Sequence, residues 1–305
     1  MTKKKTRYKI IGGIIFIIMT ILIVSGICYF KFRSVYEIQS LVFETPKSKL
    51  DENYKFNGEL ITPRDGKKTH PVVIISHGYN SSMDNCEDVA KAYAKAGYSA
   101  VIFDFVGGSR NSSTQVHSSN MTTFTEIKDY EIVLDYVKKS DAFDKDNIFL
   151  SGQSFGGLVA TVVAEKHQQD INAVVLFYPA YNMVENSAKV LEKGPAKKKK
   201  GTVDGSVTTN GDLYLWDGLL VSEKYLNELN SLDIVEIIKN IRNDVIIIQG
   251  DKDDDVTIES TKSFLPNFQS VKMVTIEGGE HGFSDNYLVQ AEKAAIEFLD
   301  SHIKK

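Results

Sequence analysis

The sequence has little cysteine, with only two among 305 residues. Cys28 lies in an apolar N-terminal run, so Cys86 is the only cysteine in the rest of the chain. An intrachain disulfide in that part is therefore excluded, and nothing in its cysteine usage requires a particular redox compartment. An excess of positive charge is also absent. The formal net charge is −4, which argues against a protein that binds nucleic acid.

Acidic residues are missing from the first 34 positions, which hold seven basic residues. The rest of the chain then carries 29 basic and 40 acidic residues, a net charge of −11. Within the N-terminal part, Ile10 to Phe30 is a run of 21 residues without a charge. As a helix it would be about 32 Å long, enough to cross a hydrocarbon core of about 30 Å. The run has no polar face, so it predicts a transmembrane helix and not a buried core helix.

The predicted transmembrane segment has two possible fates. A cleaved signal peptide would have a shorter apolar run and a small-x-small cleavage site, for which 24–26 is a weak candidate. The apolar run continues to Phe30 and basic residues follow it, which favours a retained anchor over a secreted protein. Five basic residues precede the span and two closely follow it. The positive-inside rule then predicts residues 1–9 in the cytoplasm and 35–305 outside a cell membrane that the chain crosses once.

Beyond the anchor, short apolar runs alternate with amphipathic stretches. Continuous apolar strands separated by helices indicate an α/β fold with a mostly parallel sheet covered on both faces. In such sheets chemistry gathers at the carboxyl ends of the strands. We expect strands at 35–46, 54–63, 71–78, 99–105, 147–151, 173–179, 244–250 and 272–278. We expect helices at 84–98, 124–140, 156–167, 232–241 and 286–303.

One stretch, from about Asn182 to Asn230, interrupts this alternation. It has no strong buried strand and includes a glycine-rich, polar segment. A structureless loop of this length is improbable in a compact domain, so we expect an inserted lid with a hairpin and one helix. The four lysines at 197–200 are interpreted as a solvated turn, with a contact to an anionic cell-surface polymer as the alternative.

Ser154 lies in the sequence GQSFGG, a Gly-x-Ser-x-Gly pattern. A chain of this length contains such a pattern by chance in roughly one protein in ten. Here the serine follows a predicted strand and precedes a predicted helix, which is the context of a nucleophile elbow. The start of a helix also favours negative charge that develops beside it. The surroundings therefore favour a nucleophile over an accidental match.

A serine hydroxyl needs a base within hydrogen-bond reach to act at neutral pH. Among six histidines, His281 follows the last predicted strand in a glycine-rich loop that can present it at the sheet edge. The base in turn needs a carboxylate, which fixes its tautomer and stabilises its charged form. The loop after the strand at 244–250 offers four, and their positions alone do not decide among Asp251, Asp253, Asp254 and Asp255.

The reaction also needs donors for the developing oxyanion, and backbone N–H groups serve best because they are preorganised. We expect one from Phe155, directly after the serine, and one from Tyr79, in the loop after the strand at 71–78. His77 and Gly78 are interpreted as residues that shape this loop and take no part in the chemistry.

These pieces resemble the α/β-hydrolase superfamily over nearly all of the chain beyond the anchor. More narrowly, the chain is similar to the cinnamoyl (feruloyl) esterase branch and to dienelactone-hydrolase-like and prolyl-oligopeptidase-like proteins. The chain order Ser154, Asp253, His281 is that of the superfamily. The family pattern has an aspartate three residues after a glycine and three before a valine, which selects Asp253. The matching pieces are ISHGY, DFVGGSRNS, MTTFTEIKDYEIVLDYV, GQSFGG, GDKDDDV and IEGGEHGFSDNY.

The resemblance implies a serine hydrolase that cuts small-molecule carboxylic esters without a metal or an organic cofactor. It also implies a lid, in which Tyr214 and Trp216 either stack on an aromatic acyl group or pack the lid onto the body. Gln153 stands where many members have histidine, and many members lack an anchor. A prolyl-oligopeptidase-like serine peptidase is the alternative, although no propeller domain and no acidic pair for a peptide N-terminus are evident. A binding protein on an idle hydrolase fold is disfavoured, because all three triad residues are present.

Overall fold

The computed structural model describes residues 34–45, 54–109, 116–196 and 212–305. By its contacts the chain divides into two units, Met1–Val35 and Tyr36–Lys305, and the second is the body described below. The predicted span from Ile10 to Phe30, the segment 1–9 and the lysines at 197–200 lie outside the described residues. Within the described ranges, no helix has the length and apolar character needed to cross a membrane.

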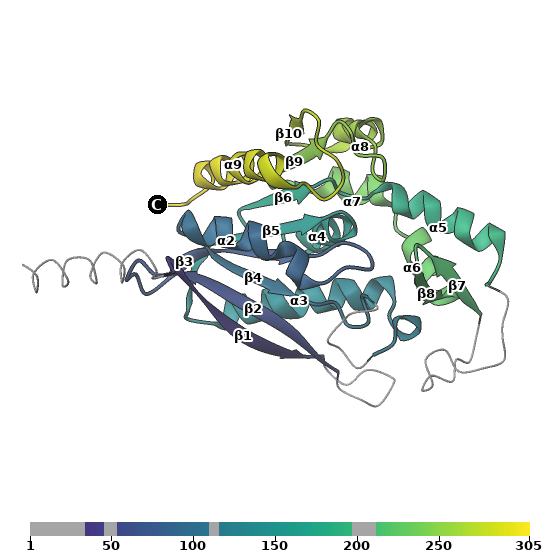
Figure 1. Ribbon diagram of the computed structural model, residues 1–305, viewed down its shortest axis with the longest axis horizontal. Coiled ribbons are helices and arrows are strands. Elements are labelled where there is room, and N and C mark those ends of the chain that lie inside the picture. The colour runs from purple at the N-terminus through teal and green to yellow at the C-terminus, as the bar shows by residue number, and fades with distance from the viewer. Residues whose placement is uncertain (1–33, 46–53, 110–115, 197–211) are drawn as a thin grey trace, which may run out of the picture. The chain divides into compact units, whose positions relative to one another are not determined.

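The body is built on a sheet for which eight strands are described, in the order β1-β2-β4-β3-β5-β6-β9-β10 (Figure 1). β2 pairs antiparallel with both β1 and β4, and the pairings from β4 across to β10 are parallel. The expected mostly parallel sheet is therefore confirmed. The strands are β1 (Tyr36–Glu44), β2 (Lys55–Pro63), β3 (His70–Ser76), β4 (Ser99–Phe103), β5 (Phe143–Gln153), β6 (Ala173–Phe177), β9 (Asp244–Gly250) and β10 (Val271–Ile276).

Helices cover both faces of this sheet. Alternate side chains of β3 show why, because Val72 and Ile74 belong to one buried cluster while Val73 and Ile75 belong to the other. The first cluster packs under α3 and α4, and the second under α2 and α9. The helices of these two layers and the adjoining turns are η1 (Met83–Cys86), α2 (Glu87–Lys95), η2 (Ser118–Asn120), α3 (Thr123–Lys139), α4 (Phe155–Lys166), α7 (Ile234–Asn240), α8 (Ile258–Phe264), η3 (Leu265–Asn267) and α9 (Asp285–Ser301).

The described parts of the expected lid, between β6 and α7, form more structure than one helix and a hairpin. They comprise α5 (Asn182–Lys193), the antiparallel hairpin β7 (Leu213–Trp216) and β8 (Leu219–Ser222), and α6 (Glu223–Asn230). α6 is fastened to the start of α3. Thr123 Oγ1 donates to the carbonyl oxygen of Tyr225 at 3.1 Å, and the Phe124 N–H donates to a carboxylate oxygen of Glu228 at 2.9 Å.

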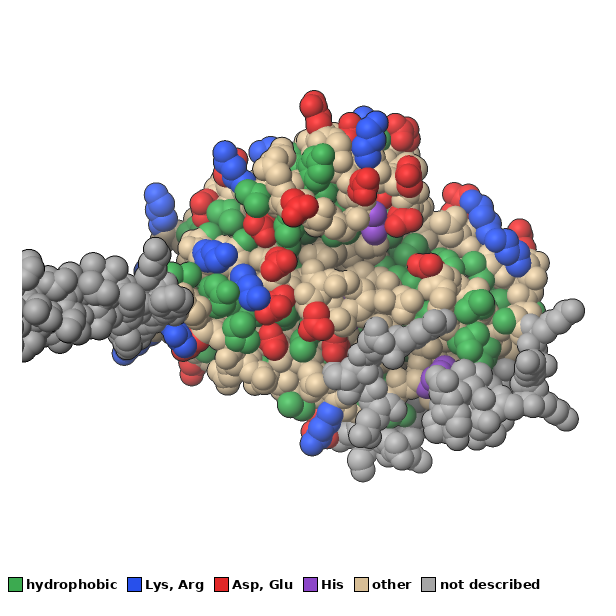
Figure 2. Space-filling model, in the orientation of Figure 1, with side chains coloured by type: hydrophobic (Ala, Val, Ile, Leu, Met, Phe, Trp, Pro, Cys, Tyr) green, Lys and Arg blue, Asp and Glu red, His purple; other side chains and the backbone are tan. Residues whose placement is uncertain are grey.

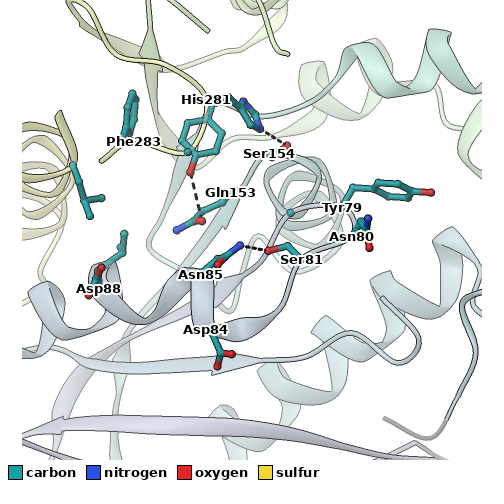
Figure 3. Close-up of a pocket in the computed structure, with 15 residues that line it drawn as sticks. Tyr79, Asn80, Ser81, Asp84, Asn85, Asp88, Gln153, Ser154, His281 and Phe283 are labelled. Atoms are coloured by element: carbon teal, nitrogen blue, oxygen red, sulfur yellow. Dashed lines mark hydrogen bonds between the residues drawn. The ribbon is translucent and has the colours of Figure 1, made fainter. Parts of the chain in front are cut away.

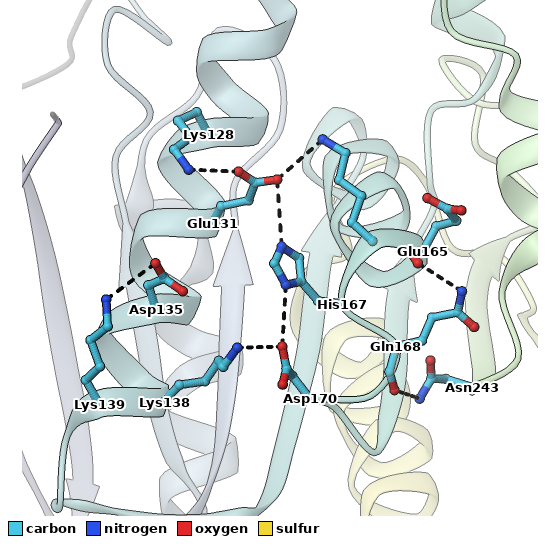
Figure 4. A network of polar contacts seen from close by, with 11 residues as sticks. Lys128, Glu131, Asp135, Lys138, Lys139, Glu165, His167, Gln168, Asp170 and Asn243 are labelled. Atoms are coloured by element: carbon cyan, nitrogen blue, oxygen red, sulfur yellow. Dashed lines mark hydrogen bonds and ion pairs between the residues drawn. The ribbon is translucent and has the colours of Figure 1, made fainter. Parts of the chain in front are cut away.

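A polar network on the surface joins α3 to the end of α4 (Figure 4). Glu131 lies 3.3 Å from the Lys166 ammonium and 3.7 Å from the His167 ring. Asp170 accepts from Lys138 at 2.5 Å and lies 3.5 Å from the other nitrogen of His167. Such partly exposed pairs each contribute up to about 1 kcal/mol, so the network adds little to stability. The network does fix α3, to which α6 of the lid is bonded, relative to α4, which follows Ser154.

Two carboxyl groups are buried on the core face of α3. Glu126 and Asp129 are each 1 % exposed. Burial raises the pKa of Asp129 to about 8, although the Val106 N–H that donates to its Oδ2 at 2.9 Å opposes the shift. Burial also raises the pKa of Glu126, and the neighbouring charge of Asp129 raises it further. The folded state therefore holds protons here that the unfolded chain has released.

We expect the Asp129→Asn variant to weaken the pH dependence of stability. Because folding raises this pKa from 3.8 to about 8, the free energy of unfolding falls as pH rises between those values, by about 1.4 kcal/mol per pH unit for each proton retained. The amide oxygen still accepts from Val106, but the titration is gone. Urea unfolding at pH 5 and pH 9 measures the difference, with the exposed Asp135→Asn change on the same helix as control. Equal slopes for wild type and Asp129→Asn would refute this account.

Candidate active site

Ser154 occupies a sharp turn between β5 and α4, at the carboxyl edge of the sheet. Its backbone has φ 53° and ψ −121°, a region that residues other than glycine rarely adopt. The exit of β6 holds this conformation from the side. The Ser154 N–H donates to the carbonyl of Phe177 at 2.9 Å, and the Ser154 carbonyl accepts from the Ala180 N–H at 3.0 Å. The strand–turn–helix context expected from the sequence is therefore present.

Two glycines of the motif allow backbone segments to touch. A Cβ at Gly152 would overlap the carbonyl of Gly156. A Cβ at Gly156 would overlap the carbonyls of Ser76 and His77, at the end of β3. A side chain at either position would force the backbones apart, so only glycine lets the turn that carries Ser154 lie against the end of β3.

His281 lies in the loop after β10, between Gly278 at φ 77° and Gly282 at φ 73°. Its Nε2 is 3.1 Å from Ser154 Oγ, and its Nδ1 is 2.8 Å from Asp253 Oδ2. Figure 3 shows the imidazole directed at the serine. The three side chains proposed from three different strand ends thus form one continuous chain of hydrogen bonds.

Asp253 is the aspartate of its loop that meets His281. Its side chain is fully buried, whereas Asp251, Asp254 and Asp255 are exposed. Its Oδ1 accepts from the backbone N–H groups of Asp255 at 3.0 Å and Val256 at 2.8 Å. Its Oδ2 accepts from Gln249 Nε2 at 3.0 Å and also faces His281 Nδ1. Every oxygen of the buried carboxylate is therefore held in place by donors.

The loops that carry Asp253 and His281 also bind each other directly. A Cβ at Gly250 would overlap the Gly279 carbonyl, so the two backbones are in contact there. The Lys252 N–H donates to that same carbonyl at 2.9 Å. Asp251 Oδ1 accepts from the Gly278 N–H at 2.6 Å. The aspartate and the histidine are thus positioned relative to each other by their own loops.

An imidazole between a hydroxyl group and a buried carboxylate is suited to proton transfer. It can accept the serine proton on Nε2 while the carboxylate holds Nδ1–H and stabilises the positive charge. Within the described ranges, no group of three histidine, cysteine, aspartate or glutamate side chains is arranged to hold a metal ion.

The loop after β3 passes directly over Ser154. A Cβ at Gly78 would lie 3.1 Å from Ser154 Cβ and 3.6 Å from its Oγ. Buried His77 shapes this loop: its Nδ1 donates to the Gly78 carbonyl at 2.8 Å and its Nε2 accepts from the Phe105 N–H at 3.1 Å. One donor and one acceptor fit a neutral ring, and burial lowers the pKa of His77. Tyr79 and Phe155 therefore belong to segments that contact the serine.

Comparison with known proteins identifies solved structures that share the fold described above. The family profile described as serine aminopeptidase, S33, matches residues 67–210. Est1E from Butyrivibrio proteoclasticus superposes with a TM-score of 0.71 at 22 % identity, over 87 % of this chain and 99 % of that chain. A dienelactone hydrolase from Anabaena variabilis gives a TM-score of 0.57 at 15 % identity, over 88 % and 99 % of the two chains.

A third structure, the esterase domain of a Rhodothermus marinus protein, has a TM-score of 0.60 at 16 % identity, over 87 % of this chain and 97 % of that domain. This chain has the α/β-hydrolase fold. No curated protein matched it in sequence. Because all three identities are low, these likenesses establish the fold and leave the reaction to be argued from the site.

A cavity of about 490 Å³ opens beside Ser154 and His281 (Figure 3). It extends along the sheet edge between the start of α2 and the loop that carries His281. A volume of this size suits a small-molecule site. Its lining consists of residues 78–81, Asp84, Asn85, Asp88, Val89, Gln153, Ser154, Tyr178, 281–283 and Leu288.

Tyr214 and Trp216, predicted to contact the substrate or to pack the lid, do not line this cavity. Tyr214 is 6 % exposed in β7. The Trp216 ring lies 5.3 Å from the Tyr79 ring, and the Tyr79 hydroxyl donates to the Trp216 carbonyl at 3.2 Å. Asn80 Nδ2 donates to the Asp217 carbonyl at 3.2 Å. In the contacts described, this hairpin packs the lid onto the loop that passes over Ser154.

Tyr178 is a site residue that the sequence analysis missed. It directly follows β6 at φ 38°, and its ring centroid is 4.6 Å from that of His281. Its N–H donates to the Ile248 carbonyl at 2.9 Å, which ties it to β9. The sequence did contain a signal for Tyr178, because this residue stands at the end of a strand, on the same edge of the sheet as Ser154. Its aromatic character made it look like a continuation of the buried strand.

Proposed function

We propose that this α/β-hydrolase is a serine esterase that cleaves carboxylic esters. The observation that carries the proposal is the chain of hydrogen bonds from Ser154 Oγ to His281 Nε2, at 3.1 Å, and from His281 Nδ1 to Asp253 Oδ2, at 2.8 Å. These distances lie in the range in which a base can take a hydroxyl proton.

The proposed reaction proceeds in two halves. Ser154 Oγ attacks the ester carbonyl while His281 Nε2 takes its proton, and the Tyr79 and Phe155 N–H groups stabilise the oxyanion. His281 then gives the proton to the alkoxide oxygen, the C–O bond breaks, and the alcohol leaves an acyl-serine. Water attacks the acyl-serine with His281 again as base, which releases the acid and restores the serine. Asp253 keeps the Nδ1–H tautomer and stabilises the imidazolium in each half.

The structural neighbours support an ester as the substrate. One structure of Est1E is described with ferulic acid bound, and another neighbour is described as an esterase domain. The matching family profile is described as a serine aminopeptidase, which favours a peptidase as the second candidate. The same three side chains would serve either reaction, so substrate choice separates them.

A matched substrate panel tests the proposal. We expect the full chain to hydrolyse p-nitrophenyl acetate and methyl ferulate, and to act more slowly on alanine and proline p-nitroanilides. A fluorophosphonate probe should label Ser154, which mass spectrometry of the labelled peptide locates. Anilides cleaved as fast as esters would replace the esterase with the peptidase, and a chain that neither turns over substrate nor takes the label would be a binding protein.

A further inference from the structure

Tyr178, the residue that follows β6, has a backbone conformation that aromatic residues rarely adopt. Its φ of 38° lies in the left-handed region, which favours glycine. The preceding residue, Phe177, accepts from the Ser154 N–H at 2.9 Å. The Tyr178 N–H itself donates to the Ile248 carbonyl at 2.9 Å, so the turn is held on both sides. Glycine would fit here with less strain, and strained residues cluster at functional sites. The tyrosine side chain is therefore expected to contribute something that glycine cannot.

The Tyr178 ring packs against two side chains of the loop after β10. Its centroid is 4.6 Å from that of the His281 imidazole, with an angle of 56° between the two planes. The same ring meets the Phe283 ring at 5.2 Å and 77°, an edge-to-face arrangement. Tyr178 and Phe283 are both buried. The ring therefore fastens the loop that carries His281 to the end of β6, beside Ser154.

The His281 imidazole borders open space, which makes a support useful. Its side chain is 25 % exposed, and Figure 2 shows a histidine at the surface in this part of the face. The cavity of about 490 Å³ lies beside it, and a Cβ at Gly282 would meet no described atom within 4 Å. The bond to Asp253 fixes Nδ1 alone, and the bond to Ser154 ends when the hydroxyl gives up its proton. The Tyr178 ring then restricts rotation of the imidazole about its bond to Asp253.

The aromatic ring of Tyr178, and not its hydroxyl group, is suited to this part. The hydroxyl donates to Gln153 Oε1 at 3.5 Å, the outer limit of a hydrogen bond. Burial raises the pKa of Tyr178, and nearby Cys86 and Asp253 raise it further, so the phenol stays protonated at neutral pH and does not act as a base. The face of an aromatic ring carries negative potential, which attracts a cation that lies within about 6 Å of its centre.

We propose that Tyr178 is a positioning residue for the base, an inference that rests on the proposed esterase. Its ring holds the His281 imidazole in line with Ser154 and stabilises the imidazolium that forms in both halves of the reaction. Because His281 acts in both halves, loss of the ring slows the formation and the hydrolysis of the acyl-serine together. The loss therefore lowers kcat and leaves KM nearly unchanged.

Two substitutions at this position separate the ring from the hydroxyl. Tyr178→Leu removes the ring and keeps an apolar side chain, whereas Tyr178→Phe removes the hydroxyl alone. For the full chain with p-nitrophenyl acetate, we expect Tyr178→Leu to lose about tenfold to a hundredfold in kcat, the cost of a displaced catalytic group, with KM little changed. Tyr178→Phe should restore kcat close to the wild-type value. An equal loss in Tyr178→Phe, or a higher KM with unchanged kcat in Tyr178→Leu, would overturn the inference.

The matched control is Tyr181→Leu, three residues further along the same segment. Tyr181 is also buried, but its ring packs on Phe264 at 5.1 Å and its hydroxyl is 2.8 Å from that of Thr161. This variant should lower Tm and keep kcat, which separates lost packing from lost positioning.

A loss of kcat in Tyr181→Leu as large as that in Tyr178→Leu would overturn the inference, because packing alone would then explain both. If Tyr178→Leu does not fold, Tyr178→Met takes its place with the same expected result. An active wild type with an unaffected Tyr178→Leu removes this inference and leaves the esterase standing. A wild type that does not hydrolyse the ester removes the proposed function and the inference with it.

Discussion

The Ser154→Ala variant is expected to lose at least about 10⁴-fold in kcat/KM for p-nitrophenyl acetate, because no other group can form the acyl intermediate. Alanine keeps the Cβ of residue 154, which lies next to Gly78, so the loop after β3 retains this contact. The unusual backbone conformation of the turn is imposed by contacts from β3 and β6, which the substitution does not remove. The loss should therefore appear in kcat and not in the folding of the chain.

Steady-state kinetics with the two proteins at equal concentration measure this effect. Ser263→Ala, on the exposed surface of α8, is the matched control and should retain wild-type rates. Thermal unfolding should give similar midpoints for all three proteins. Turnover by Ser154→Ala within tenfold of the wild type would remove Ser154 from its proposed role, whatever the probe labels.

The Asp253→Asn variant is expected to lower kcat by about 10³- to 10⁴-fold. The backbone donors of Asp255 and Val256 hold one side-chain oxygen, so the amide oxygen takes that position. The NH₂ group then replaces Oδ2 and faces His281 Nδ1. Only an unprotonated Nδ1 accepts from it, which places the ring proton on Nε2 and leaves no lone pair for the serine. The variant fails as a base, and Gln249 Nε2, which donates to Oδ2 in the wild type, loses its acceptor there.

The three neighbouring aspartates provide internal controls. Asp254→Asn and Asp255→Asn alter exposed carboxylates and should retain rates close to wild type. Asp251→Asn should show a smaller loss than Asp253→Asn, because Asp251 accepts from the Gly278 N–H and steadies the loop before His281. Comparable losses in Asp253→Asn and Asp254→Asn would show that the carboxylate next to His281 has no special part in the reaction.

Local pattern was sufficient to predict most of the sheet and its direction. The runs at β3, β4, β6 and β9 are apolar on both faces, which requires helices on both sides and hence parallel pairing. The same alternation placed Ser154 and His281 at strand ends on one edge. Asp253 came from a family pattern, because four aspartates in five positions look alike until the fold buries one of them.

The remaining features depend on contacts that no local pattern encodes. α8 is only seven residues long, begins with Thr257 as its cap and contains two serines, so it resembles a loop in sequence. In α5 only Ser187 is buried, which leaves little apolar signal for the second lid helix. The cavity is formed by α2, the end of β5 and the loop after β10, which are more than 60 residues apart. Only the folded chain brings these parts together.

The hairpin of the lid has a consequence for how such hydrolases diversify. Its turn bonds to Asn80, and its Trp216 carbonyl bonds to the hydroxyl of Tyr79, whose N–H is proposed to stabilise the oxyanion. Both attachments end on backbone carbonyls, so another lid sequence can keep them only where its hairpin backbone follows the same path. The side chains of this part of the lid can therefore change, while its backbone is constrained by the support that it gives to the residue beside the serine.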